Sequence, residues 1–162
     1  MGRPIQLRPR LMALASRVPP GSRVADIGTD HARVPVYLLQ RGITERVIAT
    51  DIRQGPLDAA KDALQRRGLR ADLRLCDGAA GLRPDEVDCV VIAGMGGDTV
   101  AAILRASPWL AGKHLLLQPQ THPERVLEVL AAWGKTPEQA EVWEGSGTSA
   151  PYRRYILFEV KA

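Results

Sequence analysis

The stretch RVADIGTDHARVPVYLLQRGITERVIATD, residues 23–51, decides the fold. Residues 23–27 form a short, largely apolar run that stops at Gly28, which predicts a strand. Residues 32–41 place apolar side chains at helical spacing, and 46–51 is again typical of a strand. A strand, a helix and a second strand joined by short loops predict a parallel β-α-β unit.

The same alternation continues through most of the chain. Further strands are expected over 71–76, 88–93 and 114–118, and further helices over 56–67, 98–105 and 123–133. Two last strands, 138–144 and 153–160, are joined by a Gly/Ser turn at 145–149 and predict a hairpin. We therefore expect an α/β fold, a single domain over residues 1–162. Its sheet is mostly parallel, with helices on both faces and an antiparallel edge.

Composition narrows the class of protein. The 162 residues fit one domain, and no apolar run approaches the ~20 residues that span a bilayer. The first residues, MGRPIQLRPR, have no apolar stretch of the signal-peptide type. Cys76 and Cys89 lack CxxC spacing and a nearby His cluster, which excludes a disulfide scaffold and a zinc module and indicates a reducing cytoplasm. We expect no metal and no membrane contact. The absence of a P-loop and of a Ser/His/Asp order argues against nucleotide triphosphatases and hydrolases.

Positive charge is concentrated at the N-terminus. The formal net charge of +4 resides entirely in the first 25 residues, which hold five arginines and no acid. Residues 5–18 have apolar side chains on one face and predict an amphipathic helix, which ends before Pro19-Pro20-Gly21. Two interpretations stay open: a solvated helix, or an edge that binds a polyanion through guanidinium groups. The candidate contacts of the second are Arg3, Arg8, Arg10 and Arg17.

Small, acidic and amide residues follow the predicted strands. In open α/β sheets, ligands bind outside the carboxyl ends of the strands, so these positions are the candidate site. The first three strands are followed by Asp26, Gly28, Asp30 and His31, by Asp51 and Ile52, and by Asp77 and Gly78. The next two are followed by Gly94 to Asp98, and by Gln118, Pro119 and Gln120.

The first of these loops lacks the dinucleotide motif GxGxxG. Gly28 is present, but Asp30 stands where the second glycine would be, and its carboxylate would repel a pyrophosphate. A cationic ligand without phosphate suits it better, and S-adenosylmethionine, with its sulfonium and ammonium groups, is such a ligand. Asp51 is placed to bind ribose hydroxyls and Asp77 an adenine amino group. Each acid taken singly could instead cap a helix or a turn.

Other candidates also have two interpretations. The loop Gly94-Met95-Gly96-Gly97 is either a tight turn or a floor where a flat ligand approaches the backbone. It lacks the Pro-Pro-aromatic sequence of amino-directed methyltransferases, which argues weakly against an exocyclic amine as acceptor. His31 either caps the following helix or faces the acceptor. We expect structural or exposed roles for His114 and His122, and packing roles for the three tryptophans.

Five segments, in this order, resemble bacterial tRNA adenine-N1 methyltransferases of the TrmK type, which act on adenine 22. They are DIGTDHARVPVYL (26–38), DIRQGPLDAA (51–60), CDGAAGL (76–82), VIAGMGG (91–97) and LLLQPQ (115–120). The resemblance covers roughly residues 7–160 and implies a Rossmann-like methyltransferase fold, S-adenosyl-L-methionine as cofactor and tRNA as partner.

The resemblance also implies roles for residues. Asp26, Gly28, Asp30 and His31 would line the methionine part of the cofactor, and Asp51 and Ile52 its ribose. Asp77 and Gly78 would line the adenine, with Ala93, Gly94 and Met95 beside the sulfonium. Asp30, His31 and Gly96 are the candidate catalytic residues, and Gly97, Gln118, Pro119 and Gln120 the candidate substrate pocket.

One departure from the family and several alternatives remain. Members carry a C-terminal helical extension, and we expect it to be absent here because the sequence stops at Ala162, just after the last strand. A methyltransferase acting on another RNA or on a small molecule would share the cofactor-binding part of the site. A binding protein that has lost catalysis would share it too. The sequence does not indicate the oligomeric state.

Overall fold

The computed structural model describes residues 3–145 and 152–162, and its centre is a seven-stranded sheet. The strands run in the order β3-β2-β1-β4-β5-β7-β6, with parallel pairing from β3 to β5 and antiparallel pairing of β7 with both its neighbours. Their bounds are β1 Val24–Ile27, β2 Val47–Asp51, β3 Asp72–Leu75, β4 Cys89–Met95, β5 His114–Pro119, β6 Glu138–Glu144 and β7 Arg153–Val160. The predicted Rossmann-like architecture is confirmed.

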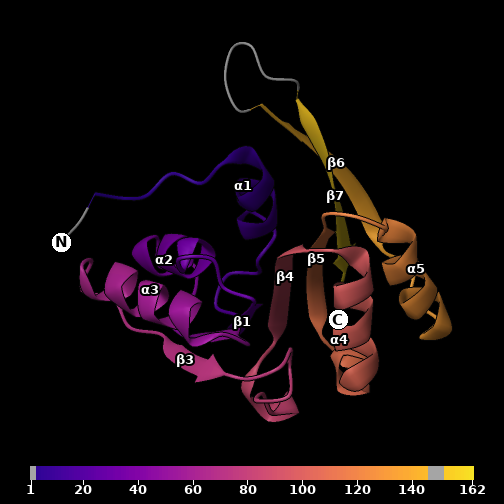
Figure 1. Ribbon diagram of the computed structural model, residues 1–162, viewed down its shortest axis with the longest axis horizontal. Helices are drawn as coiled ribbons and strands as arrows, with labels where there is room; N and C mark the ends of the chain where they lie inside the picture. Colours follow the sequence, from indigo (N-terminus) through magenta and orange to yellow (C-terminus); the bar gives the residue numbers. More distant parts are fainter. Residues whose placement is uncertain (1–2, 146–151) are drawn as a thin grey trace.

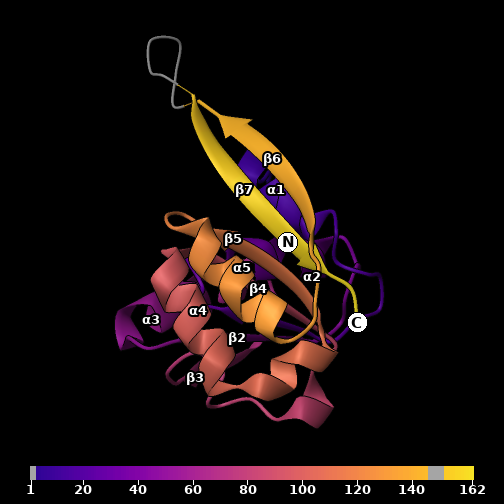
Figure 2. The same ribbon diagram turned by 90° about the vertical axis from the view of Figure 1, so that its right-hand side faces the viewer.

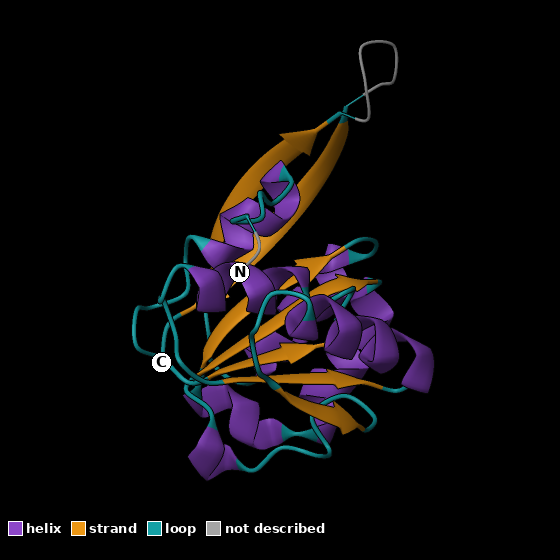
Figure 3. Ribbon diagram, turned by 90° about the vertical axis from the view of Figure 1, so that its left-hand side faces the viewer, coloured by secondary structure: helices purple, strands orange, loops and turns teal. Residues whose placement is uncertain are grey.

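Helices cover both faces of this sheet. In Figure 1, α1, α2 and α3 lie on one side and α4 and α5 on the other, and Figure 3 shows the strands between these layers. The α-helices are α1 Pro9–Ala15, α2 Arg33–Gln40, α3 Gln54–Gln65, α4 Gly97–Ala106 and α5 Pro123–Ala132. Two short 3₁₀ helices that the sequence analysis did not predict are η1 Pro84–Glu86 and η2 Pro108–Gly112.

The central strands are apolar because both of their faces are buried. On β5, Leu115 and Leu117 pack in the cluster that includes α4 and α5, whereas Leu116 packs in the cluster that includes α1 and α2. All three leucines are fully buried. Alternate side chains of a strand point to opposite faces, so a strand between two helical layers is apolar at every position.

Several elements differ by one or a few residues from the sequence-based expectation, and two of the differences change how the chain is interpreted. The first helix spans Pro9–Ala15 rather than 5–18, because a proline favours the first helical turn and holds the preceding Arg8 in an extended conformation (φ −62°, ψ 155°). Strand β4 continues through Gly94 to Met95, with a shift of register between Ala93 and Met95. The first half of the predicted glycine-rich loop therefore belongs to the strand.

Strands β6 and β7 form the predicted hairpin, which projects from the body of the molecule with α1 beside it (Figure 2). The turn expected at 145–149 lies, beyond Gly145, outside the described residues. Within residues 3–145 and 152–162, no helix has the length and apolarity to cross a bilayer.

Candidate functional site

A cavity of about 680 Å³ opens at the carboxyl ends of β1, β2, β3 and β4. This volume falls in the usual range of small-molecule sites. All the residues that the sequence analysis assigned to the cofactor line this strand-end cavity. They are Asp26, Gly28, Asp30, His31, Asp51, Ile52, Asp77, Gly78, Ala93, Gly94 and Met95. Residues spread over some 70 positions of the chain thus meet at one edge of the sheet.

The loop after β1 is held to β2 by its backbone. The amides of Gly28 and Thr29 both donate to the carbonyl oxygen of Thr50, each at 2.9 Å. Farther along the loop, His31 and Ala32 both adopt left-handed backbone conformations, with φ of 52° and 54°. Such conformations cost non-glycine residues on the order of 1–3 kcal/mol and are concentrated at functional sites.

Asp26 is a buried carboxylate beneath this loop. Burial, helped by the nearby carboxylates of Asp30 and Asp51, raises the pKa of its carboxyl from about 3.8 to about 7. The Oγ1 hydroxyl of Thr29, buried in the cavity wall, has no hydrogen-bond partner among the residues that the structure describes. This hydroxyl also interacts with the carboxyl of Asp26, where it lowers the pKa and partly offsets the effect of burial.

The end of β2 contributes a fixed carboxylate beside an exposed apolar side chain. Asp51 is buried, and its Oδ1 accepts a hydrogen bond of 2.9 Å from the backbone amide of Arg53. The neighbouring Ile52 is 64% exposed, an unusual state for isoleucine, and it lines the cavity. Together they offer a hydrogen-bond acceptor and an apolar surface to the same ligand.

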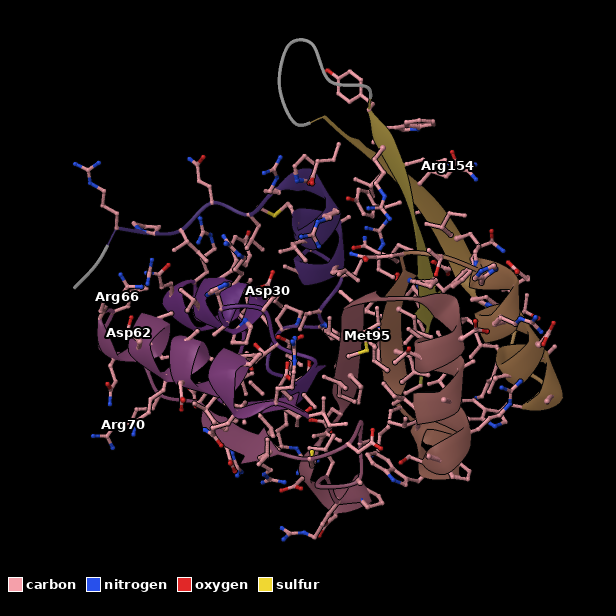
Figure 4. The ribbon with its side chains drawn as sticks, in the orientation of Figure 1. Asp30, Asp62, Arg66, Arg70, Met95 and Arg154 are labelled. Atoms are coloured by element: carbon pink, nitrogen blue, oxygen red, sulfur yellow. The ribbon has the colours of Figure 1, made fainter. Side chains whose placement is uncertain are left out.

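Asp30 and His31 lie at the open side of the cavity, where their side chains are mostly exposed. His31 Nε2 is 3.5 Å from Asp30 Oδ1, a distance that makes an ion pair when the imidazole is protonated. Figure 4 shows Asp30 beside α2 and Met95 at the end of β4. A second reactant entering the cavity would meet Asp30 and His31 first.

The residues predicted for the substrate pocket are not brought together. Gln120 lines the cavity, but Gly97, Gln118 and Pro119 are not among its described lining residues, and neither is Gly96, a candidate catalytic residue. The side-chain amide of the buried Gln118 donates instead to the backbone oxygen of Arg10, at 2.9 Å. The amide of Gly97 donates to the backbone oxygen of Thr121, at 2.7 Å. Gln118 and Gly97 therefore hold elements of the fold together.

The N-terminal arginines contact carboxylates of the hairpin. The Nε atoms of Arg8 and Arg10 lie 3.3 and 3.6 Å from Oε2 of Glu144. Arg17 Nε lies 3.5 Å from Oε1 of Glu159. Neither interpretation of the N-terminal charge anticipated these ion pairs, and RNA contact by Arg3, Arg8, Arg10 and Arg17 stays a prediction.

Sequence reasoning missed some lining residues. Thr29, Arg33 and Arg53 line the cavity. The signal for Arg33 and Arg53 was their position one or two residues beyond candidate residues at strand ends. Among the described residues, no group of three or more His, Cys, Asp or Glu side chains is arranged to hold a metal ion.

Comparison with known proteins agrees with this geometry. The methyltransferase domain family matches residues 7–139. The tRNA (adenine(22)-N(1))-methyltransferase of Bacillus subtilis (strain 168) is 38% identical over 130 residues, which are 78% of this chain and 55% of that protein. The chain thus spans about half the length of this curated relative.

Several solved structures also superpose on this chain. The crystal structure of the B. subtilis M1A22 tRNA methyltransferase TrmK superposes with a TM-score of 0.86 and 30% identity, covering 97% of this chain and 67% of that one. A Streptococcus pneumoniae protein solved in complex with S-adenosyl-L-methionine gives a TM-score of 0.81 at 29% identity, with 94% and 72% covered. M. capricolum TrmK, solved with S-adenosyl-homocysteine, gives 0.83 at 25% identity, with 98% and 69% covered. With its sheet order, its strand-end cavity and a family match over most of its length, the chain belongs to the methyltransferase domain family and is related to the TrmK enzymes.

Proposed function

We propose that this chain transfers a methyl group from S-adenosyl-L-methionine to N1 of an adenine in tRNA, at the position of adenine 22. The observation that carries the proposal is the strand-end cavity, where residues from four strand ends meet. The B. subtilis relative, named for this reaction, supports the choice of acceptor. The reaction would take place in the cytoplasm, where tRNA is modified.

The cavity fits the chemistry of this cofactor. Four carboxylates line it, from Asp26, Asp30, Asp51 and Asp77, and they suit a ligand with sulfonium and ammonium cations. The loop after β1 has no GxGxxG sequence, so it offers no glycine-rich cradle for a pyrophosphate. The buried Oγ1 of Thr29 gives the ligand a further polar contact.

Each side of the cavity would hold one part of the cofactor. Asp26, Gly28, Asp30 and His31 would contact the methionine part, and Asp51 with Ile52 the ribose. Asp77 and Gly78 would contact the adenine. Ala93, Gly94 and Met95 would lie beside the sulfur, with Gly96 the next residue along the chain.

The reaction requires little proton transfer by the protein. When bound, S-adenosyl-L-methionine supplies a methyl group on a cationic sulfur. Adenine N1 has an in-plane lone pair, so no residue has to deprotonate it before the N–CH₃ bond forms and the S–CH₃ bond breaks. Positive charge then appears on the adenine ring, and the exposed carboxylate of Asp30 at the open side of the cavity stabilises it. His31 would orient that carboxylate or receive a proton from the adenine amino group.

The remaining acceleration comes from position and from exclusion of water. Holding N1 in line with the methyl–sulfur bond supplies up to about 7–11 kcal/mol in well-oriented reactions. N1 lies on the Watson–Crick edge, so a paired adenine has to be exposed before it reaches the cavity.

The test is incubation of the chain with unmodified tRNA and methyl-labelled cofactor, followed by nucleoside analysis. We expect 1-methyladenosine at position 22. If label is found only in another RNA or in a small molecule, the proposed acceptor is wrong. If the chain binds the cofactor but transfers label to no acceptor, it is a non-catalytic relative.

A variant pair tests the cofactor assignment separately. Asp51→Ala is expected to weaken S-adenosylhomocysteine binding in calorimetry, because it removes the buried carboxylate at the ribose position. Asp58→Ala, on the exposed side of α3, is the matched control and should bind as the unmodified chain does. Equal affinity of both variants would refute the ribose assignment.

A further inference from the structure

A second cavity, of about 410 Å³, lies beside the first. It is bounded by the N-terminal segment, by α2 and by α3, and we call it the α2–α3 groove. Its charged and polar lining residues are His31, Arg33, Asp62, Arg66 and Arg67. Three guanidinium groups against one carboxylate give the groove a positive charge.

The groove's arginines face weaker ion-pair partners than Arg8, Arg10 and Arg17 do, although Arg67 Nη1 also donates to the backbone oxygen of Ala63 at 3.0 Å. Arg66 contacts Asp62 at 3.2 Å, but both side chains are about two-thirds exposed (66% and 68%), and such a pair is worth at most about 1 kcal/mol. Arg33 and Arg67 form no ion pair with any residue in the described part of the chain. By contrast, Glu144, which contacts Arg8 and Arg10, and Glu159, which contacts Arg17, have largely buried side chains.

The groove adjoins the strand-end cavity. His31, Arg33 and Ala59 line both. The shared wall lies at the open side of the cavity, beside Asp30 and His31. An extended ligand in the α2–α3 groove would therefore end at the entrance through which an acceptor base reaches the methyl group.

We propose that the α2–α3 groove binds the phosphate backbone of the RNA substrate next to the target nucleotide. The inference rests on the proposed function. Guanidinium groups pair with phosphate oxygens in a bidentate manner, and clustered arginines are typical of backbone contacts. Contact with the backbone positions the nucleic acid without reading its bases, and the base is then presented to the cavity. Figure 4 shows Asp62 on α3 and Arg66 just after it, at the opposite side of the molecule from Arg154 on the hairpin.

The experiment compares two double variants that each remove two exposed or partly exposed arginines. Arg66→Gln/Arg67→Gln changes the groove, and Arg105→Gln/Arg125→Gln changes α4 and α5 on the other face of the sheet. Binding of unmodified tRNA is measured over a range of salt concentrations without cofactor. Each lost phosphate contact lowers the slope of log K against log salt by about 0.7–0.9, so the groove variant, with two contacts removed, should lose roughly 1.4 to 1.8 in slope. The α4/α5 variant should keep its slope, and both should bind S-adenosylhomocysteine normally.

A conservative variant separates charge from fold. Arg66→Lys/Arg67→Lys keeps both charges and should retain most of the slope. Equal slopes for the groove variant and the unmodified chain, or no tRNA binding by the unmodified chain, would overturn the inference. The two proposals fail in different ways. Methylation of tRNA with an unchanged slope rejects the groove alone, whereas a reduced slope without any methylation rejects the proposed reaction and leaves the groove as an RNA-binding surface.

Discussion

Gly28 and Met95 are fitted to each other across the wall of the strand-end cavity. A β-carbon placed on Gly28 would lie 2.1 Å from Cε of Met95, far inside van der Waals contact. Gly28 also has a φ of 74°, in the region that favours glycine. The end of β1 therefore has no side chain at this position, and the methyl group at the end of β4 fills that space.

We expect Gly28→Ala to weaken cofactor binding. The new methyl group would push the flexible Met95 side chain away from Gly28, and both residues line the cavity. Calorimetry with S-adenosylhomocysteine should show a loss of affinity of about tenfold, the effect of roughly 1.4 kcal/mol. Met95→Ala in the same chain should recover part of it. Gly42→Ala is the control, because Gly42 has a similar φ of 65° with nothing within 4 Å of the added carbon. If both alanine variants lose the same affinity, contact with Met95 is not the cause.

The buried carboxyl of Asp26 should make stability depend on pH. The pKa of this carboxyl in the folded chain, about 7, lies above the ordinary 3.8. At pH values between 3.8 and 7, the folded chain therefore keeps a proton on Asp26 that the unfolded chain has lost. The stabilisation that protonated Asp26 gives the folded state is thus fully present below about pH 4. It is lost as the pH rises through 7, and the free energy of unfolding falls by roughly 4 kcal/mol in all. Denaturation of Asp26→Asn and the unmodified chain at several pH values should show a difference that grows in favour of the variant up to pH 7–8. Parallel curves would contradict the raised pKa.

Glu159 should be important for stability rather than for chemistry. Its Oε2 lies 2.8 Å from Nε2 of His114 and its Oε1 lies 3.5 Å from Nε of Arg17, so it joins β5, β7 and the residues after α1. Hydrogen bonds to charged groups contribute about 1.5–3 kcal/mol, and Glu159→Gln should lower the free energy of unfolding in urea by an amount in this range. Glu141→Gln, which breaks an exposed pair with Arg154, should cost less than about 1 kcal/mol. A smaller loss of unfolding free energy for Glu159→Gln than for Glu141→Gln would argue against a stabilising role of Glu159.

Gly97 should prove structural. A β-carbon there would lie 2.0 Å from the backbone oxygen of His122, and backbone cannot move aside as a side chain can. Overpacking of this kind costs about 1–3 kcal/mol or more, so Gly97→Ala should lower the melting temperature by several degrees. Gly112→Ala, with open space around the added carbon, should change it little. A Gly97→Ala chain of normal stability that no longer methylates RNA would instead support the substrate-pocket assignment.

The cavity could be predicted from the sequence because strand ends are local features. Apolar runs that stop at Gly28, at Asp51 or at Asp77 mark the ends of parallel strands, and such ends meet at one edge of a sheet. The same reasoning singled out Gln118, which follows an apolar run but whose side-chain amide donates to the backbone oxygen of Arg10. Position along a strand does not indicate which face a side chain occupies where the pattern is apolar throughout.

By itself, the sequence determined the order of strands and helices along the chain, the closing hairpin and the acidic strand ends, because each depends on patterns within a few residues. Tertiary structure alone decided which charges meet. Arg10 and Glu144 are 134 positions apart, and no local pattern joins them. The same holds for the α2–α3 groove, whose charge depends on the packing of two helices under the N-terminal segment. Charge at the N-terminus was visible in the sequence, but only the fold shows that carboxylates of the hairpin contact most of it while Arg66, directly after α3, stays exposed.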